Sequence, residues 1–344
     1  MGHWLAYFLT RSRRMSVLVV ERDNLGYGAS TRNAGFLSSG NVSEWLLELT
    51  EQGDEATLHN FAARRRGVQI VLNEFAGSIG LDRCGSADFD PITKEKSQLA
   101  ARFNQFVTSQ GGRVPYEIRS VQLGGRSQDV WFNRDDYAIH PVQLLNEIHQ
   151  RVREQGVKFA YRTEVITLND GLAVVDSTGV KQEVRYGHGY LCTNAFAPEL
   201  HPTSTVEPGR GQILVTKPCR VPSTSVLGFM QEGHDYFRFV DGRILVGGGR
   251  HRFGNSEATT ELATTSPVQQ YLESLAQKIA GPIEIEVERS WAGVMGLPNG
   301  SHSSARSLET PIALDGHTEI IAGLGGWGVT LAPYLAELIA SRTG

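Results

Sequence analysis

The first 23 residues, MGHWLAYFLTRSRRMSVLVVERD, constrain the fold more than any other stretch of the chain. A predicted amphipathic helix runs into the apolar stretch SVLVV, which stops at the acidic residue Glu21. A helix followed by a buried strand with a carboxylate at its end is typical of the second half of a dinucleotide-binding βαβ unit, where the carboxylate accepts hydrogen bonds from ribose hydroxyls. Glu21 is therefore a predicted nucleotide-binding residue. The alternative is an ordinary solvated glutamate at a strand end.

The first strand of such a unit and the GxG part of its glycine turn are missing before this helix. Gly2 corresponds to the third glycine of the GxGxxG fingerprint, which lets the helix pack closely on the strand. The sequence thus predicts an N-terminally truncated nucleotide-binding unit.

Composition limits the other functions that the chain can have. Its 344 residues suffice for two domains, and 40% hydrophobic with 20% charged residues describe an ordinary globular protein. A net charge of -4 gives no reason to expect nucleic acid as a partner, and we expect no membrane span, because no apolar run approaches about 18 residues. The three cysteines are widely spaced, which favours a cytoplasmic protein without disulfides. The histidines lack metal-ligand spacing, so no metal is expected.

Helical spacing is expected over 44–79, 94–111, 140–156, 266–280 and 329–342. Strands are expected at 157–161, 163–168, 172–177, 183–193, 211–218, 225–230, 283–296 and 318–324, with a hairpin turn at Asp241-Gly242 between YFRFV and RILVGG. The pattern predicts an α/β fold: a Rossmann-like domain built from 1–85, 135–205 and 310–344. An inserted, mostly antiparallel α+β substrate domain would comprise 86–134 and 206–309.

Five motifs carry a resemblance that covers the chain from Gly2 to about Ala340. They are GASTRNAGF after the acidic strand end, RGQ in PGRGQILVT, DGRILVGGG, WAGVMGLP and the final GLGGWGVTLAP. Their order resembles that of the D-amino-acid-oxidase-like (DAO) superfamily of FAD-dependent oxidoreductases. This superfamily includes glycine oxidases, D-amino-acid dehydrogenases and gamma-glutamylputrescine oxidoreductases.

The resemblance implies a noncovalently bound FAD and a set of residues around it. No cysteine lies between Gly293 and Pro311, so the covalent flavin link of some relatives is not expected. The implied cofactor-binding residues are Gly2, Glu21, Arg22, Ser30, Thr31, Arg32, Asn33, Ala34, Gly35, Val165, Thr193, Asn194, Ala195, Gly323, Gly325, Gly326, Gly328, Val329 and Thr330. The glycines before the last helix would direct main-chain N–H groups at the negative charge that gathers on a reduced flavin.

For the substrate side, the resemblance implies Tyr236, Arg238 and Trp327 as catalytic-site residues. Gly326 occupies the place of an arginine that binds the substrate carboxylate in glycine-oxidase-like relatives, so Tyr236, Arg238 or Arg250 would have to supply that contact. For Arg238 the alternative is an ordinary strand charge paired with a neighbour.

The implied activity is oxidation of the C–N bond of a small amine or amino acid by hydride transfer to flavin N5, with oxygen or a quinone as electron acceptor. The alternative is a truncated homologue without FAD or catalytic activity. A third interpretation, a phosphate-binding loop at GGGRHRFGN, lacks the required GKS/T.

Overall fold

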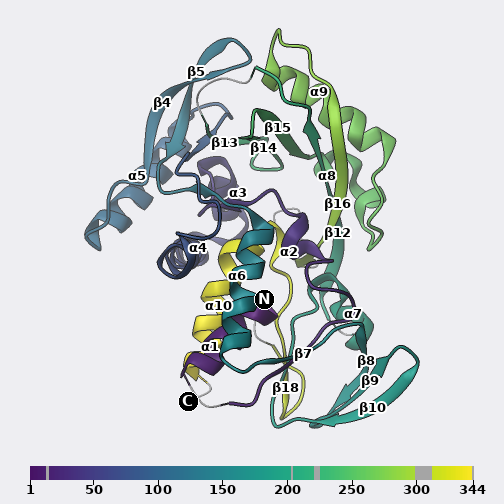
Figure 1. The fold of residues 1–344 in the computed structure, drawn as a ribbon. Coiled ribbons are helices and arrows are strands. Elements are labelled where there is room, and N and C mark those ends of the chain that lie inside the picture. Colours follow the sequence, from purple (N-terminus) through teal and green to yellow (C-terminus); the bar gives the residue numbers. More distant parts are fainter. Residues whose placement is uncertain (13–14, 203, 221–224, 299–311, 343–344) are drawn as a thin grey trace.

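The computed structural model describes residues 1–12, 15–202, 204–220, 225–298 and 312–342. It confirms the expected α/β fold: short parallel strand pairs with helices occupy one half, and a large, mostly antiparallel sheet occupies the other (Figure 1). The helices are α1 (Gly2–Ser12), α2 (Ala29–Arg32), α3 (Val42–Gln52), α4 (Asp54–Phe75), α5 (Lys94–Ser109), α6 (Pro141–Glu154), α7 (Ala197–Leu200), α8 (Arg250–Phe253), α9 (Ser266–Ala280) and α10 (Gly328–Arg342), with the short 3-10 turns η1 (Asn194–Phe196), η2 (Gly254–Glu257) and η3 (Gly325–Trp327).

The strands of the nucleotide half are short. They are β1 (Leu18–Val20), β2 (Phe36–Leu37), β6 (Tyr137–Ala138), β7 (Lys158–Ala160), β8 (Thr163–Asn169), β9 (Leu172–Ser177), β10 (Val180–Arg185), β11 (Gly189–Leu191), β17 (Ile312–Ala313) and β18 (Thr318–Ile320). Strand β1 pairs in parallel with β7, and β11 pairs in parallel with β18. Within the described ranges these are two separate sheets, because no strand pairs with the second edge of either β1 or β11.

Helix α1 is buried on more of its surface than the single apolar face of an amphipathic helix would require. Its six consecutive residues Trp4 to Leu9 are all buried, because α1 packs against both α6 and α10. Strand β1 is less enclosed than the buried strand that SVLVV predicts, since Leu18 is 45% exposed. The reason is that β1 has a pairing partner on one edge only.

The large sheet has eight strands in the order β16-β12-β15-β14-β13-β3-β5-β4. These are β3 (Ser86–Asp88), β4 (Tyr116–Leu123), β5 (Arg126–Asn133), β12 (Val206–Thr216), β13 (Leu227–Met230), β14 (Asp235–Val240), β15 (Arg243–Gly248) and β16 (Val287–Pro298). Helix α9 covers one face through a core that includes Leu214, Val246 and Leu272. Ile213 and Leu245, on the opposite face, pack against Ala34 and Phe36 of the nucleotide half. The site therefore lies where these two halves meet.

Several local expectations are confirmed and two need correction. The β14–β15 hairpin turns at Asp241-Gly242 as expected, with φ of 49° and 71°. The expected helical region 44–79 is broken into α3 and α4 at Gly53, whose φ is 80°. The expected strand 183–193 is two strands, because the chain leaves the β9–β10 pair near Gly187 and joins β18 instead. The two-domain boundaries stay a prediction, and the boundary at 309/310 lies outside the described residues.

Candidate active site

The segments expected around the adenosine end of FAD lie together at the end of β1. Glu21 follows β1 and its Oε1 accepts a hydrogen bond of 3.0 Å from the Asp23 main-chain N–H. The Arg22 guanidinium donates to Glu199 on α7 at 2.9 Å and lies 3.7 Å from Glu164 on β8. Arg22 thereby joins the strand end that carries Glu21 to the strand that carries Val165. Glu21 itself is exposed, so its remaining oxygen is open to a ligand.

The loop with Ser30 to Gly35 is fixed by its own polar side chains. The Arg32 guanidinium donates to the carbonyls of Tyr27 at 2.8 Å and of Ala292 on β16 at 3.1 Å, while Trp291 Nε1 donates to the Arg32 carbonyl at 2.9 Å. Asn33 donates to the Ala29 and Ser30 carbonyls and accepts from the Gly35 N–H. Because these polar groups already have main-chain partners, they shape the loop, and exposed Ser30 and the free face of Gly28 remain for a ligand.

Thr193, Asn194 and Ala195 form the turn into η1, next to β16. Thr193 Oγ1 and Asn194 Oδ1 are buried and have no hydrogen-bond partner among the described residues. Asn194 has a φ of 49°, and a side chain at Gly296 on β16 would collide with its Oδ1. Buried polar atoms without partners are rare because leaving one unpaired costs about 1–3 kcal/mol. A bound polar group such as the ribityl chain of FAD would satisfy both oxygens, so these residues fit the cofactor that the sequence predicts.

The glycines before α10 place Trp327 at the same junction. Gly323 and Gly325 have φ of 75° and 54°, which few other residues adopt, and Gly326 has open space around its Cα. Trp327 is buried, and its ring lies 6.5 Å from that of Phe229. Phe229 contacts Phe36 at 5.3 Å, and Phe36 contacts Tyr236 at 5.6 Å. These aromatic side chains form one continuous wall from Trp327 to Tyr236.

Tyr236 and Arg250 lie at the other end of that wall. Burial first, and then the charge of Asp235, raises the pKa of Tyr236 to about 12, so its phenol stays a hydrogen-bond donor. The phenol ring lies over Gly247, where a Cβ would collide with it. Burial lowers the pKa of Arg250, which the neighbouring Tyr236 opposes. Across the described residues, no acceptor bonds the Arg250 guanidinium, which is unusual for a half-buried cation.

Arg238 has a different environment. Its Nη1 donates to the carbonyls of Ile139 at 2.9 Å and of Gly35 at 3.3 Å, tying the Ser30–Gly35 loop to β14. Its Nε is buried without a partner in the described part of the chain. Of the arginines expected near the substrate, Arg250 therefore has no hydrogen-bond acceptor among the described residues, whereas Arg238 supports the loop.

Sequence reasoning missed a buried charged cluster directly behind Trp327. Trp327 Nε1 donates to Glu44 Oε1 at 2.6 Å, and Glu44 in turn pairs with Arg64 at 3.4 Å. Glu44 and Glu48 are spaced i, i+4 on α3, a spacing that normally indicates a solvated helix face. The only sequence signal was that the residues around this pair are apolar or aromatic.

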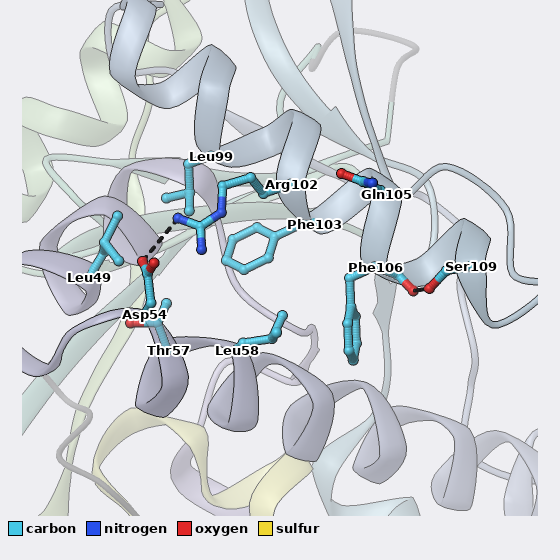
Figure 2. Close-up of a pocket in the computed structure, with 10 residues that line it drawn as sticks. All are labelled: Leu49, Asp54, Thr57, Leu58, Leu99, Arg102, Phe103, Gln105, Phe106 and Ser109. Atoms are coloured by element: carbon cyan, nitrogen blue, oxygen red, sulfur yellow. Dashed lines mark hydrogen bonds and ion pairs between the residues drawn. The ribbon is translucent and has the colours of Figure 1, made fainter.

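A cavity of about 300 Å³ lies elsewhere, between α5 and the α3–α4 pair (Figure 2). Its lining is mixed: apolar side chains such as Leu58, Phe103 and Phe106 alternate with polar ones, and an Arg102–Asp54 ion pair of 2.9 Å spans one side. None of the residues expected to bind cofactor or substrate lines this cavity.

The comparison with family models identifies the class of this protein as FAD-dependent oxidoreductase. A sequence profile of the DAO family, described as FAD dependent oxidoreductase, matches residues 1–342. The chain belongs to this family, and its cofactor is FAD.

Solved structures with the same fold are distant in sequence. L-proline dehydrogenase from P. horikoshii superposes with a TM-score of 0.75 at 18% identity, covering 99% of this chain and 90% of that one. Glycine oxidase from Geobacillus kaustophilus gives 0.71 at 17% identity, with 99% and 90% covered. L-alpha-glycerophosphate oxidase from Mycoplasma pneumoniae, solved with FAD bound, gives 0.73 at 15% identity, with 99% and 91% covered.

A search of curated protein sequences finds no match. In the described ranges, no helix combines the length and the apolar character that crossing a bilayer requires.

Proposed function

We propose that the protein oxidises the C–N bond of a small amine or amino acid, with its noncovalently bound FAD accepting a hydride at flavin N5. The observation that carries this proposal is the convergence of the predicted segments at one junction. The Thr193–Asn194 turn, with its unsatisfied oxygens, lies against β16, and the Ser30–Gly35 loop is bonded to the same strand. Trp327 and Tyr236, joined by the aromatic wall, would then line the substrate side of the flavin.

FAD supplies the hydride acceptor when bound. The residues of this chain bind and orient the cofactor and the substrate. Glu21 would accept hydrogen bonds from the ribose, Thr193 and Asn194 would hold the ribityl side, and the N–H groups of the 323–328 loop would stabilise the negative charge of the reduced flavin. The aromatic wall excludes water from the reacting C–H bond, because burying that bond among apolar rings leaves no room for solvent. This scheme assigns no protein acid or base to the step.

The test is an absorbance spectrum of the purified protein. Noncovalent flavin gives bands in the blue and near-ultraviolet that are released by acid precipitation and bleached anaerobically by a substrate amine. Following the bleaching with oxygen and then with a soluble quinone identifies the electron acceptor. A folded protein without flavin bands, even after incubation with FAD, would favour the FAD-deficient homologue instead.

Glu21 provides a direct test of the adenosine side. Glu21→Ala removes a charged acceptor worth about 1.5–3 kcal/mol, so the dissociation constant of FAD should rise about 10-fold or more. The matched control is Glu164→Ala, which removes a nearby carboxylate that lies 3.7 Å from the Arg22 guanidinium. Equal FAD retention in the two variants would remove Glu21 from the site.

Arg250 is proposed as the residue that binds a substrate carboxylate, together with the Tyr236 phenol. Arg250→Met should raise KM for an amino-acid substrate about 10- to 100-fold while leaving an amine without a carboxylate unaffected. Arg252→Met is the control, since Arg252 lies on the same short helix but already donates to Gln231. A uniform loss on both substrates in Arg250→Met would contradict this role.

A cytoplasmic location, supported by the free cysteines, is likewise a proposal.

A further inference from the structure

Three ionisable side chains form a cluster in the interior behind the candidate active site. Glu44 and Glu48 from α3 and Arg64 from α4 are 4%, 0% and 1% exposed. Arg64 Nη1 lies 3.4 Å from Glu44 Oε1, and its Nη2 donates to Glu48 Oε1. The guanidinium is stacked between two indoles, 4.2 Å from the Trp45 ring and 4.0 Å from the Trp327 ring. We name this set the Glu44–Arg64–Glu48 cluster.

The cluster contains two carboxyl groups and one guanidinium, so full ionisation would leave one uncompensated negative charge in the interior. Such a charge is costly in a low dielectric, and a buried carboxyl group avoids it by keeping a proton. Burial raises the pKa of Glu44 to about 8, against the attraction of Arg64 and with the added repulsion of Glu48. Burial also raises the pKa of Glu48.

The groups that face Glu44 from each element are few. Arg64 comes from α4, Glu48 from its own helix α3, and the neutral Trp327 indole from the turn before α10. Asn41 caps the start of α3, its side chain lying 3.4 Å from Glu44 Oε2, and Gly233 of the β13–β14 turn approaches the same oxygen. Glu44 is thus the one member of the cluster that contacts Trp327 by a hydrogen bond.

We propose that Glu44 is a positioning residue that holds Trp327, and with it the glycine loop 323–328, through an exchangeable proton kept within the Glu44–Arg64–Glu48 cluster. With the proton present the cluster is neutral and Trp327 Nε1 donates to an uncharged carboxyl group. With the proton lost, the same N–H donates to a carboxylate, and the extra charge lies directly behind the loop. The protonation state of Glu44, a group behind the site, would thereby affect the glycine loop 323–328 beside the flavin.

The first test observes Trp327 itself. The protein has five tryptophans, so the indole N–H signals of ¹⁵N-labelled, FAD-bound protein are few, and Trp327→Phe identifies the signal of Trp327. The Trp327 signal should shift with pH with a midpoint near 8. Glu44→Gln, which mimics the protonated group, should abolish that shift. Glu257→Gln, in a buried Arg210–Glu257 pair far along the chain, should leave it unchanged.

A second variant keeps the test decisive if Glu44→Gln folds poorly. Glu48→Gln leaves one carboxyl group facing one guanidinium, so the midpoint should fall by more than about 1 pH unit, because the excess charge is gone. A Trp327 signal that does not move between about pH 6 and about pH 10, or a midpoint that is the same in wild type and Glu48→Gln, would overturn the proposal.

The link to the flavin rests on the proposed function and has its own measurement. The flavin absorbance bands should shift with the same midpoint as the Trp327 signal, and Glu44→Gln should remove that shift. If the protein binds no flavin, the proposed function fails while the Trp327 titration still decides the role of Glu44. If flavin binds and its absorbance bands do not change with pH while the Trp327 signal does, the proposed effect of Glu44 on the flavin is refuted.

Discussion

Two buried arginines show how the number of buried carboxylates around a guanidinium changes what an ion pair does. Arg210 on β12 meets buried Glu257 in two parallel hydrogen bonds of 2.8 Å, and Gln212 donates to the same carboxylate at 2.9 Å. A second carboxylate, Glu261, lies 3.7 Å from Arg210 but is 70% exposed. Arg64 meets two buried carboxyl groups, Glu44 and Glu48, and its guanidinium lies over the rings of Trp45 and Trp327. Both sites are almost completely buried.

The two sites have opposite effects on carboxyl protonation. Burial alone would raise the pKa of Glu257, but the hydrogen bonds from Arg210 and Gln212 and the Arg210 charge bring it below its usual value. At Glu44 burial wins, because one guanidinium is shared between two acids. The hydrogen bonds and charge of Arg210 therefore keep the pKa of Glu257 low, whereas the burial of two carboxyl groups beside one guanidinium raises the pKa of Glu44.

The largest expected effect comes from removing each arginine. Arg64→Met leaves two buried carboxyl groups facing each other and should cost about 3–5 kcal/mol of unfolding free energy near pH 8, and less near pH 5, where both take up protons. Arg210→Met leaves a single buried carboxylate, Glu257, and should cost a similar amount with a weaker pH dependence, because Glu261 is exposed to solvent. Urea unfolding at the two pH values measures both. Equal pH dependence in the two variants would break the distinction between the sites.

Helix packing beside the cluster gives the next effect. A Cβ at Gly67 on α4 would overlap the Thr330 main-chain carbonyl on α10, so Gly67→Ala should push these helices apart and cost about 1–3 kcal/mol. The separation should also weaken the stacking of Arg64 on Trp327, seen as a change in tryptophan fluorescence. Gly77→Ala is the control, since a Cβ there meets nothing within 4 Å. Similar losses in both variants would show that the α4–α10 contact is not the cause.

The two carboxyl groups themselves should respond unequally. Near pH 6 Glu257→Gln replaces an ionised partner of Arg210 and should cost about 1–3 kcal/mol, whereas Glu44→Gln replaces a group that must take up a proton on folding and should stabilise the protein by about 2 kcal/mol. Thermal unfolding of both variants beside the wild type measures the difference. A large loss in Glu44→Gln at this pH would mean that Glu44 is ionised in the folded protein.

The smallest signal, taken per pH unit, is the pH dependence of stability itself. The folded pKa of Glu44, about 8, is above the value of 4.5 expected in the unfolded chain, so its contribution is complete below about pH 4.5 and is lost as the pH rises to about 8. Asp136, whose pKa burial raises to about 6, adds a loss of the same sign at lower pH. Wild type should therefore lose stability relative to Glu44→Gln by at most about 1.4 kcal/mol per pH unit over this window. Urea midpoints that run parallel in the two proteins would contradict the assignment.

Local patterns predicted much of the chain. Helix α9 spans Ser266–Ala280, as its apolar spacing indicates, and the β14–β15 hairpin follows from Asp241-Gly242, whose positive φ values match the twist of paired strands. The β4–β5 hairpin was not predicted, because its strands carry mainly polar residues. The Gly124-Gly125 pair, with φ of 59° and 79°, was the signal available for it.

The family and its cofactor were also determined by the sequence, because ordered motifs along the whole chain match FAD-dependent oxidoreductases. Only the tertiary structure decided what the individual charges do. Arg238 and Arg250 are twelve positions apart and look alike in sequence. Yet main-chain carbonyls accept from the Arg238 guanidinium, whereas no acceptor in the described ranges bonds that of Arg250. Glu44 and Glu48 have the spacing of an exposed helix face and became a buried cluster because α4 and the turn before α10 close over them. Burial and pairing depend on segments distant in the chain, and no local pattern carries that information.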